Sequence, residues 1–195
     1  QEAEEMAATG FVLAFILGLI ITLCGVYNLD NLAEILGATP TIIQDTKSYM
    51  KIILIGAPFM TSQLVINNQL RFQGSAVYAM IGLVSGAILN IGLDPIFIFT
   101  LKLGVAGAAL ATVISQTVSF AILLFGSYKG PNLRIKFQNI RLNAHYLIQI
   151  INGGTPSLFR NGLMSFAVIL MNHAAGALGG DAAIAAMSVV NRATF

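Results

Sequence analysis

The chain has 195 residues, of which 56% are hydrophobic and only 9% are charged. A soluble domain carries about a quarter charged residues, so this composition excludes a water-soluble globule and predicts a protein embedded in the lipid bilayer. The formal charge of +2, from ten Lys and Arg against eight Asp and Glu, excludes a nucleic-acid-binding surface. The single cysteine, Cys24, excludes a disulfide framework and a cysteine-based metal site.

Apolar runs long enough to cross a bilayer divide the chain. A hydrocarbon core of about 30 Å requires roughly 20 helical residues. Because the last apolar run contains the chain end at Phe195, and the chain opens at Gln1 without a methionine, we expect a piece of a longer protein. The runs predict an all-α, polytopic transmembrane helical bundle. The expected complete spans are residues 6–26, 52–70, 76–100, 103–128 and 155–178, and a truncated span begins near residue 182.

A polar stretch separates the fourth span from the fifth. Gly153 and Pro156 interrupt the apolar residues there, and proline is favoured in the first turn of a helix, so we expect the fifth span to begin near Thr155. The residues before it, 142–152, then form a short interfacial helix with mixed faces. The expected organisation is a first lobe over residues 1–128, a cytoplasmic loop over 129–154 and the start of a second lobe over 155–195.

Lys and Arg in the short loops predict the orientation, because loops on the cytoplasmic side carry an excess of them. If the first span runs outward, more of these cations fall inside the cell than outside. We therefore predict that the first span runs from the cytoplasm outward. The expected inner cations are Arg71, Lys129, Arg134, Lys136 and Arg141, and the expected outer ones are Lys47, Lys51 and Lys102.

Polar side chains recur at a spacing of four within three of the spans. Residues at i and i+4 lie on one side of a helix, so each span presents one polar stripe. In hydrocarbon such groups face other helices or a water-filled cavity, so the three stripes predict one shared cavity. The pairs are Gln63 with Asn67, Asn90 with Asp94, and Thr112 with Gln116.

Asp94 is the one carboxylate within these stripes. At helical rise, Asn90 and Asp94 lie at depths similar to that of Thr112 on the next, antiparallel span. Oxygen donors suit Na⁺, and a carboxylate in a low dielectric favours its protonated form. Pro95 cannot donate to the carbonyl of Ile91, which leaves that oxygen for a ligand, a water or a hydroxyl. We predict that Asp94, Asn90 and Thr112 bind Na⁺ or H⁺, with waters or other helices completing a Na⁺ shell.

Structural interpretations of the same residues stay open. Asp94 could lock two helices through hydrogen bonds, and Gln63, Asn67 and Gln116 could serve as interhelical glue. His173 is either a proton relay or a satisfied core residue. Arg160 could snorkel to the cytoplasmic interface or contact a substrate. Small residues, such as Gly82 with Gly86, predict close helix packing.

Enzyme signatures are missing from the sequence: it has no phosphate-binding loop, no paired histidines for a metal and no Ser, His and acid on a matching face. We therefore expect a protein that is not an enzyme and that has no cofactor besides a coupling ion.

Six segments, in order, resemble the bacterial type of the multidrug and toxic compound extrusion (MATE) transporters. Each segment alone is a weak signal, whereas six in the expected order and spacing are a strong one. The segments are Ala3-Glu4-Glu5 with Gly10; Asn67-Asn68 with Arg71, Gln73 and Gly74; Asn90 with Asp94-Pro95 and Phe97-Ile98-Phe99; Gly104 with Gly107-Ala108-Ala109, Ala111-Thr112 and Ser115-Gln116; Pro156-Ser157 with Arg160; and Gly180-Asp181 with Ala183-Ile184-Ala185-Ala186.

The resemblance implies twelve helices in two lobes, of which this piece supplies helices three to seven and the start of helix eight. It also implies a cation site at Asn90, Asp94 and Thr112, and a substrate cavity at Gln63, Asn67 and Gln116. Another branch of the family carries a Glu on helix seven, and residues 155–178 contain none. The chain is therefore expected to form part of the MATE fold: most of the first lobe and the start of the second.

The function implied is secondary active efflux of small amphipathic or cationic organic compounds, driven by Na⁺ or H⁺, by a protein that is a monomer at full length. Two alternatives stay open. A lipid-linked oligosaccharide flippase of the same wider superfamily would line its cavity with several Arg or Lys, and a non-transporting membrane scaffold would use the polar stripes only as glue.

Overall fold

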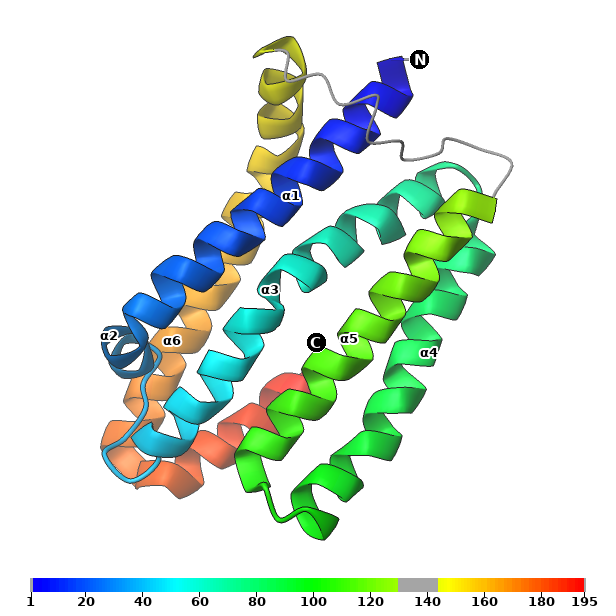
Figure 1. Ribbon diagram of the computed structural model, residues 1–195. Helices are drawn as coiled ribbons and strands as arrows, with labels where there is room; N and C mark the ends of the chain where they lie inside the picture. The colour runs from blue at the N-terminus through cyan, green and yellow to red at the C-terminus, as the bar shows by residue number, and fades with distance from the viewer. Residues whose placement is uncertain (1, 130–143, 195) are drawn as a thin grey trace.

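The computed structural model describes residues 2–129 and 144–194, and residues 130–143 of the expected loop lie outside this part. The described residues form long helices and contain no strand, which confirms the predicted all-α bundle (Figure 1). The elements are α1 (Glu2–Tyr27), α2 (Leu29–Ile35), α3 (Ile43–Phe72), α4 (Ala76–Pro95), the π-helix η1 (Ile96–Thr100), α5 (Gly104–Lys129) and α6 (Ala144–Thr194).

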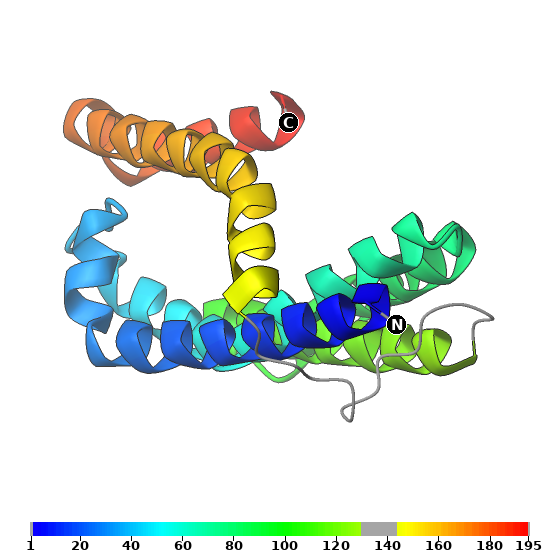
Figure 2. The same cartoon turned by 90° about the horizontal axis from the view of Figure 1, so that it is seen from above.

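Four of the helices pack into a bundle in the spatial order α1, α3, α5, α4 (Figure 1). α3 lies against both α1 and α5, and α5 also lies against α4. Figure 2 shows that the orange and red parts of α6 stand apart from these four helices over most of their length. The bundle and α6 are therefore two differently packed regions.

A glycine and a proline bring α1 and α3 together. A Cβ atom at Gly18 of α1 would lie 2.5 Å from the Cα of Pro58 in α3, so only glycine fits this crossing. Pro58 has no amide proton, which deprives the carbonyl of Leu54 of its usual donor within the helix. The hydroxyl of Thr22 on α1 donates to that carbonyl at 2.6 Å. The crossing thus supplies the hydrogen bond that the proline removes.

Two glycines of α4 form the packing face against α5 that their spacing predicts. A Cβ atom at Gly82 would lie 2.4 Å from the side chain of Leu123, and one at Gly86 would lie 2.9 Å from the Cβ of Ser119. Backbones approach this closely only where side chains are small. This close approach places polar side chains of α5, such as Ser119, against the backbone of α4.

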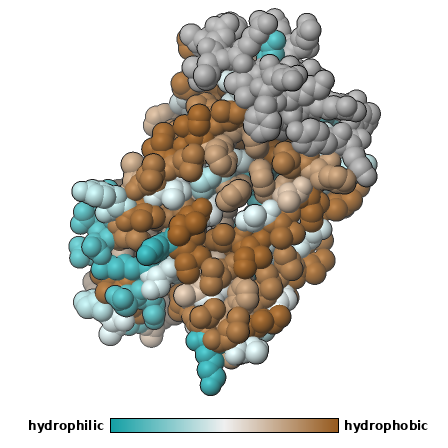
Figure 3. All heavy atoms as spheres, in the orientation of Figure 1, coloured by the Kyte–Doolittle hydropathy of each residue, from teal (hydrophilic) through white to brown (hydrophobic). Residues whose placement is uncertain are grey.

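Apolar side chains fill the core and also cover the outside of the bundle. Ile66 and Leu70 of α3 pack with Leu123 of α5 and Phe11 of α1, and the rings of Phe11 and Phe120 stack with centroids 6.2 Å apart. Figure 3 shows a mostly hydrophobic outer face over these helices. An apolar exterior of this extent suits contact with lipid.

Five helical stretches within the described residues are long and apolar enough to cross a membrane, which agrees with the number of complete spans expected from the sequence. They are Glu5–Tyr27, Ile43–Phe72, Ala76–Thr100, Gly104–Ser127 and Ile148–Ser188.

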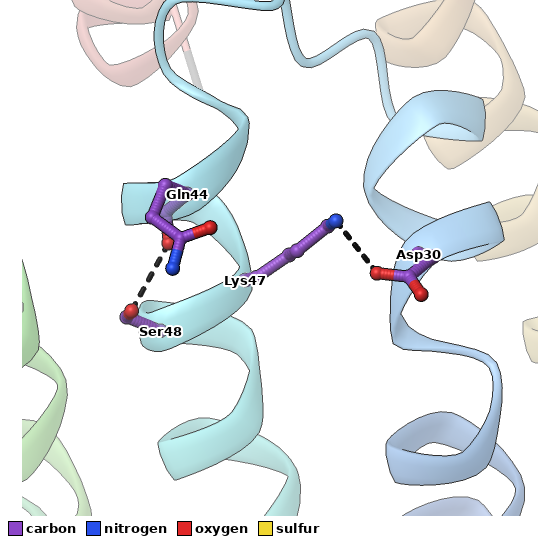
Figure 4. A network of polar contacts seen from close by, with 4 residues as sticks. All are labelled: Asp30, Gln44, Lys47 and Ser48. Atoms are coloured by element: carbon purple, nitrogen blue, oxygen red, sulfur yellow. Dashed lines mark hydrogen bonds and ion pairs between the residues drawn. The ribbon is translucent and has the colours of Figure 1, made fainter.

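The second span is part of a longer helix than its apolar run indicates. Lys51 does not end it, because α3 begins at Ile43. The short helix α2, which the sequence analysis did not anticipate, lies beside this extension. Lys47 of α3 and Asp30 of α2 form an ion pair with 2.6 Å between Nζ and Oδ1 (Figure 4). The hydrophobic run marks the part of α3 that suits lipid, whereas polar contacts stabilise the helix beyond it.

The third span changes its helical form after Pro95. α4 ends there, and the next turn, η1, is a π-helix in which the amide of Leu101 donates to the carbonyl of Ile96 at 2.9 Å. A proline cannot continue the regular pattern of amide donors, and π turns are frequent at functional sites. The irregular backbone begins directly after Asp94.

The expected break before Thr155 is absent. α6 is helical from Ala144 through the Gly153 and Pro156 region, whereas the sequence predicts a short interfacial helix over 142–152 and a helix start near Thr155. Figure 2 shows instead a sharp bend between the yellow and orange parts of α6, and Pro156 is the proline inside this helix. A proline can bend a helix without ending it.

The membrane stretch Ile148–Ser188 has 41 residues. A straight helix of that length would extend for about 60 Å, twice the thickness of a hydrocarbon core. Gly180, with φ of 60° and ψ of −153°, divides it. The helix beyond Gly180 corresponds to the further span that the sequence predicts from residue 182.

Candidate functional site

A small polar cavity of about 230 Å³ lies where α3, α4 and α5 meet. Each helix contributes polar side chains to an otherwise apolar surrounding. Four of the six residues that the sequence analysis assigned to a shared site line this cavity: Gln63, Asn90, Thr112 and Gln116. The other lining residues are Leu83, Gly86, Ala87, Ser115 and Ser119.

The helical repeat explains why α5 contributes most of the polar lining. Thr112, Ser115, Gln116 and Ser119 are spaced by three and four residues, which places them along one face of the helix. Ser115 and Ser119 were not among the predicted site residues. A spacing of three identifies both serines, because Ser115 lies three residues after Thr112 and Ser119 lies three residues after Gln116.

Buried hydrogen bonds join the three helices at this cavity. Gln63 of α3 donates through Nε2 to the hydroxyl of Ser119 on α5 at 2.9 Å. Ser119 donates in turn to the carbonyl of Gly82 on α4 at 2.7 Å. Because the single hydroxyl proton of Ser119 goes to Gly82, the amide group of Gln63 must supply the other proton. The side-chain oxygen of Gln63, Oε1, therefore takes no part in the hydrogen bond to Ser119.

Two buried oxygen atoms in the cavity wall have no hydrogen-bond partner within the described part of the chain: Oε1 of Gln63 and Oγ of Ser115. The two side chains are 5% and 2% exposed. An unsatisfied buried polar atom costs about 1–3 kcal/mol. A ligand or water that carries hydrogen-bond donors would remove this cost, so the cavity wall favours such a guest.

Asp94 is connected to the cavity through Asn90. It is half-buried and accepts a hydrogen bond from Nδ2 of Asn90, one helical turn earlier, with 3.3 Å between Nδ2 and Oδ1. Asp94 is not itself a lining residue of the cavity, whereas Asn90 is. The side-chain oxygen of Asn90 stays available, because its nitrogen is the atom that contacts Asp94.

Thr112 faces the same cavity from α5. Its hydroxyl donates to the carbonyl of Ala108 at 2.9 Å, so its lone pairs are free to accept a hydrogen bond or to coordinate a cation. The structure thus brings an amide and a hydroxyl oxygen to one cavity and links the carboxylate to the amide. Hard oxygen donors of these three kinds suit Na⁺, whereas a proton would bind to the carboxylate alone.

Asn67 does not line this cavity. Its side chain is 6% exposed, and its Nδ2 donates to the carbonyl of Ala79 on α4 at 3.0 Å. This contact fastens α3 to α4 and corresponds to the interhelical interpretation that the sequence left open. A spacing of four fixes the helix face of a residue but not which backbone carbonyl its amide meets.

The two weaker candidates on α6 lie away from the cavity. His173 is exposed, and its Nδ1 lies 3.0 Å from the carbonyl of Ile169 in the same helix. Arg160 is also exposed. Neither side chain is among the lining residues of the cavity between α3, α4 and α5.

Residues 1–96 match the MatE family model. The chain is 34% identical over 179 residues to the multidrug export protein MepA of Staphylococcus aureus strain RF122, and 30% identical over 177 residues to MepA of Staphylococcus saprophyticus. Each match covers 87% of this chain and 39% of the relative. The chain therefore spans about two-fifths of the length of these curated relatives.

Solved structures of transporters have the same arrangement of helices. A multidrug resistance MATE family transporter of the MOP superfamily, in an inward-facing conformation, superposes with a TM-score of 0.90 at 32% identity, over 97% of this chain and 44% of that one. A MOP superfamily transporter from Pyrococcus furiosus superposes with a TM-score of 0.83 at 32% identity, over 98% of this chain and 43% of that one. The partial fold expected from the sequence is therefore confirmed.

Proposed function

Because the chain belongs to the MATE family, we propose that it is part of a secondary active antiporter that exports amphipathic, often cationic, organic compounds. Inward movement of Na⁺ or H⁺ drives the export. The names of the MepA relatives as multidrug export proteins support this proposal. The proposed location is the plasma membrane of a bacterium, and the proposed state of the complete protein is a monomer.

One observation carries the proposal. The half-buried carboxylate of Asp94 accepts a hydrogen bond from the amide of Asn90, which lines a polar cavity between apolar helices. Charged groups in membrane helices are costly and are characteristic of ion pathways. Asp94, Asn90 and Thr112 are proposed to hold the coupling ion. Gln63 and Gln116 are proposed to contact the substrate, and Asn67 supports α3, the helix of Gln63, by its hydrogen bond to α4.

The proposed coupling is a competition for Asp94. When Na⁺ or H⁺ neutralises the carboxylate, the attraction between Asp94 and an organic cation in the adjoining cavity is lost. The amide of Asn90 then loses its charged acceptor and can reorient. Through this amide, a change of charge at Asp94 reaches a lining residue of the cavity, while the π-helical turn after Pro95 provides a backbone that can change its hydrogen-bond pattern.

Na⁺ requires more oxygen ligands than these residues supply. Asp94, the side-chain oxygen of Asn90 and the hydroxyl of Thr112 offer donors of the right kind, and waters or other parts of the complete protein are proposed to fill the remaining positions. A proton requires only the carboxylate. Binding of Na⁺ would therefore use the oxygens of Asn90 and Thr112, whereas binding of a proton would not require them.

Efflux of a fluorescent cationic dye by the complete protein in sealed vesicles tests the proposal. Imposing a sodium gradient in one series and a pH gradient in another identifies the driving ion. We expect Asp94→Asn to abolish the stimulation by either gradient, and Asp45→Asn, which changes an exposed carboxylate at the start of α3, to preserve it. Gradient-driven export at the wild-type rate by Asp94→Asn would refute the assignment.

The alternative functions lack support at the cavity. A flippase for a pyrophosphate-linked lipid requires cationic side chains around its headgroup, and the lining residues of the cavity include no Lys or Arg. A scaffold would not bind organic cations, so a thermal shift of the purified protein by such compounds distinguishes it from a transporter.

A further inference from the structure

α6 is held to the rest of the described chain at few points. None of the residues from 148 to 188 is buried. Near its start, Ile150 approaches Gly10 of α1. The second contact joins the far part of α6 to the loop 36–42, between α2 and α3. Within the described part of the chain, a small set of residues thus joins α6 to the bundle.

Asp181 supplies the polar part of the second contact. It directly follows Gly180, where the positive φ of 60° breaks the helix. Thr39 donates through Oγ1 to Oδ1 of Asp181, and Thr41 donates through Oγ1 to Oδ2 at 2.7 Å. Each oxygen of the carboxylate therefore receives one hydroxyl proton from the loop. These residues are 140 or more positions apart in the sequence.

The loop and α6 are also in close steric contact here. A Cβ atom at Gly37 would lie 3.2 Å from the Cβ of Asn172 and 3.4 Å from Nδ1 of His173. A Cβ at Gly176 would lie 3.9 Å from Cγ2 of Thr39. Gly37 has a φ of +91°, which favours glycine independently of the space available. The loop therefore fits against successive turns of α6 before it reaches Asp181.

We propose that Asp181, Thr39 and Thr41 form a latch that closes this end of the transporter, and that the latch opens and re-forms in each transport cycle. The inference rests on the proposed antiporter function, in which α6 must move relative to the bundle. In the predicted orientation, this is the extracellular end. The loop leads directly into α3, which carries Gln63, so the latch and the cavity are connected by one helix.

The chemistry of the latch suits a reversible contact. Its acceptor is a carboxylate and its donors are neutral hydroxyls, and within the described residues Asp181 has no salt bridge. Opening therefore separates no ion pair, and water can replace the two hydroxyl donors. The bonds are nevertheless directional, so they favour one position of α6 over others.

Distance measurement by pulsed electron paramagnetic resonance on the complete protein in lipid nanodiscs tests the latch. Spin labels are attached at Ile35→Cys and Leu178→Cys, which are exposed positions on the two sides of the contact, with Cys24→Ser and any other cysteine replaced. The wild type is expected to show a large short-distance population. Asp181→Asn, which offers one acceptor oxygen instead of two, is expected to lower the ratio of short to long distances by about fivefold or more.

Asp45→Asn is the matched control, because it removes an exposed carboxylate at the same end, and it is expected to leave the ratio unchanged. Thr39→Val combined with Thr41→Val keeps the carboxylate and removes both donors, and it is expected to reproduce the shift. Adding Asp181→Asn to these two changes should have little further effect, because the interaction is already lost.

The latch is refuted if Asp181→Asn and the double valine variant both keep the wild-type distance distribution, or if Asp45→Asn shifts it equally. These outcomes are separate from those of the antiporter proposal. A shift of the distances in a protein whose dye export ignores Asp94 would refute the coupling site and leave the latch in place. Unchanged distances in a protein whose export depends on Asp94 would refute the latch and leave the coupling site in place.

Discussion

Within the described part of the chain, the four-helix bundle and α6 differ in how tightly they are packed. In the bundle, glycines permit close crossings, and buried side chains such as Gln63 and Ser119 satisfy polar groups across three helices. α6 buries none of its residues from 148 to 188 and meets the bundle through a few contacts. The helices α3, α4 and α5 of the bundle form the cavity by their own contacts, whereas the exposure of α6 is that of a chain spanning about two-fifths of its curated relatives' length.

The largest effect on stability is expected at the α1–α3 crossing. Gly18→Ala places a methyl group 2.5 Å from the Cα of Pro58, where the backbone cannot retreat without separating the helices. We expect a loss of about 1–3 kcal/mol or more, as for other overpacked sites. Thermal unfolding of the complete protein in detergent, followed by circular dichroism, measures the change.

Gly92→Ala is the matched control for this crossing, because no atom lies within 4 Å of the position of its Cβ. Within a helix, alanine is favoured over glycine by up to about 1 kcal/mol. We therefore expect an unchanged or slightly higher midpoint temperature. An equal loss of stability in both variants would show that close packing between α1 and α3 is not what distinguishes the bundle.

The buried relay gives the second largest effect. Ser119→Ala removes the link between Gln63 and the carbonyl of Gly82, and it leaves both without their observed partner. We expect a loss of about 1–3 kcal/mol. Ser115→Ala, four residues earlier on the same face, removes a hydroxyl that has no partner within the described chain, and it should be nearly neutral for stability.

For Ser115→Ala, we expect a larger effect on ligand binding than on stability. If the unsatisfied oxygens of Gln63 and Ser115 receive donors from the guest of the cavity, Ser115→Ala will weaken dye binding while the melting temperature of the empty protein stays constant. Equilibrium binding and thermal unfolding of the same preparation provide both values. A large loss of stability in Ser115→Ala would contradict the assignment of its hydroxyl to the cavity.

The smallest effect is expected at the ion pair between α2 and α3. Asp30 is 80% exposed on its side chain and Lys47 is 30% exposed, so solvent screens their attraction. Lys47→Ala should cost between zero and about 1 kcal/mol. Thermal unfolding at low and high salt measures this loss of stability. A loss as large as that of Ser119→Ala would show that α2 contributes more to the stability of the bundle than its exposed contacts indicate.

The helical repeat and the hydrocarbon thickness made much of the bundle predictable. Apolar runs gave the number of complete spans, and the spacing of four placed Gln63, Asn90, Thr112 and Gln116 on faces that meet. These features depend on local geometry alone. For the same reason, the spacing rule could not reveal that the amide of Asn67 meets a carbonyl of α4 rather than the cavity.

The features that the sequence did not predict depend on contacts between distant parts of the chain. The extension of α3 back to Ile43 lies outside the apolar run and is accompanied by the contact of Lys47 with α2. Pro156 was expected near a helix start, and only the surroundings decide whether a proline starts a helix or bends one. No local pattern connects Asp181 with Thr39 and Thr41.

The central claim is that ion binding at Asp94 controls affinity in the neighbouring cavity. Equilibrium binding of a radiolabelled organic cation to the complete, purified protein, titrated with Na⁺ at constant pH and with H⁺ at constant Na⁺, tests it most directly. The account predicts that at least one of the ions weakens binding to the wild type and to Asp45→Asn but has no effect on Asp94→Asn. The same ion dependence in Asp94→Asn as in the wild type would contradict it.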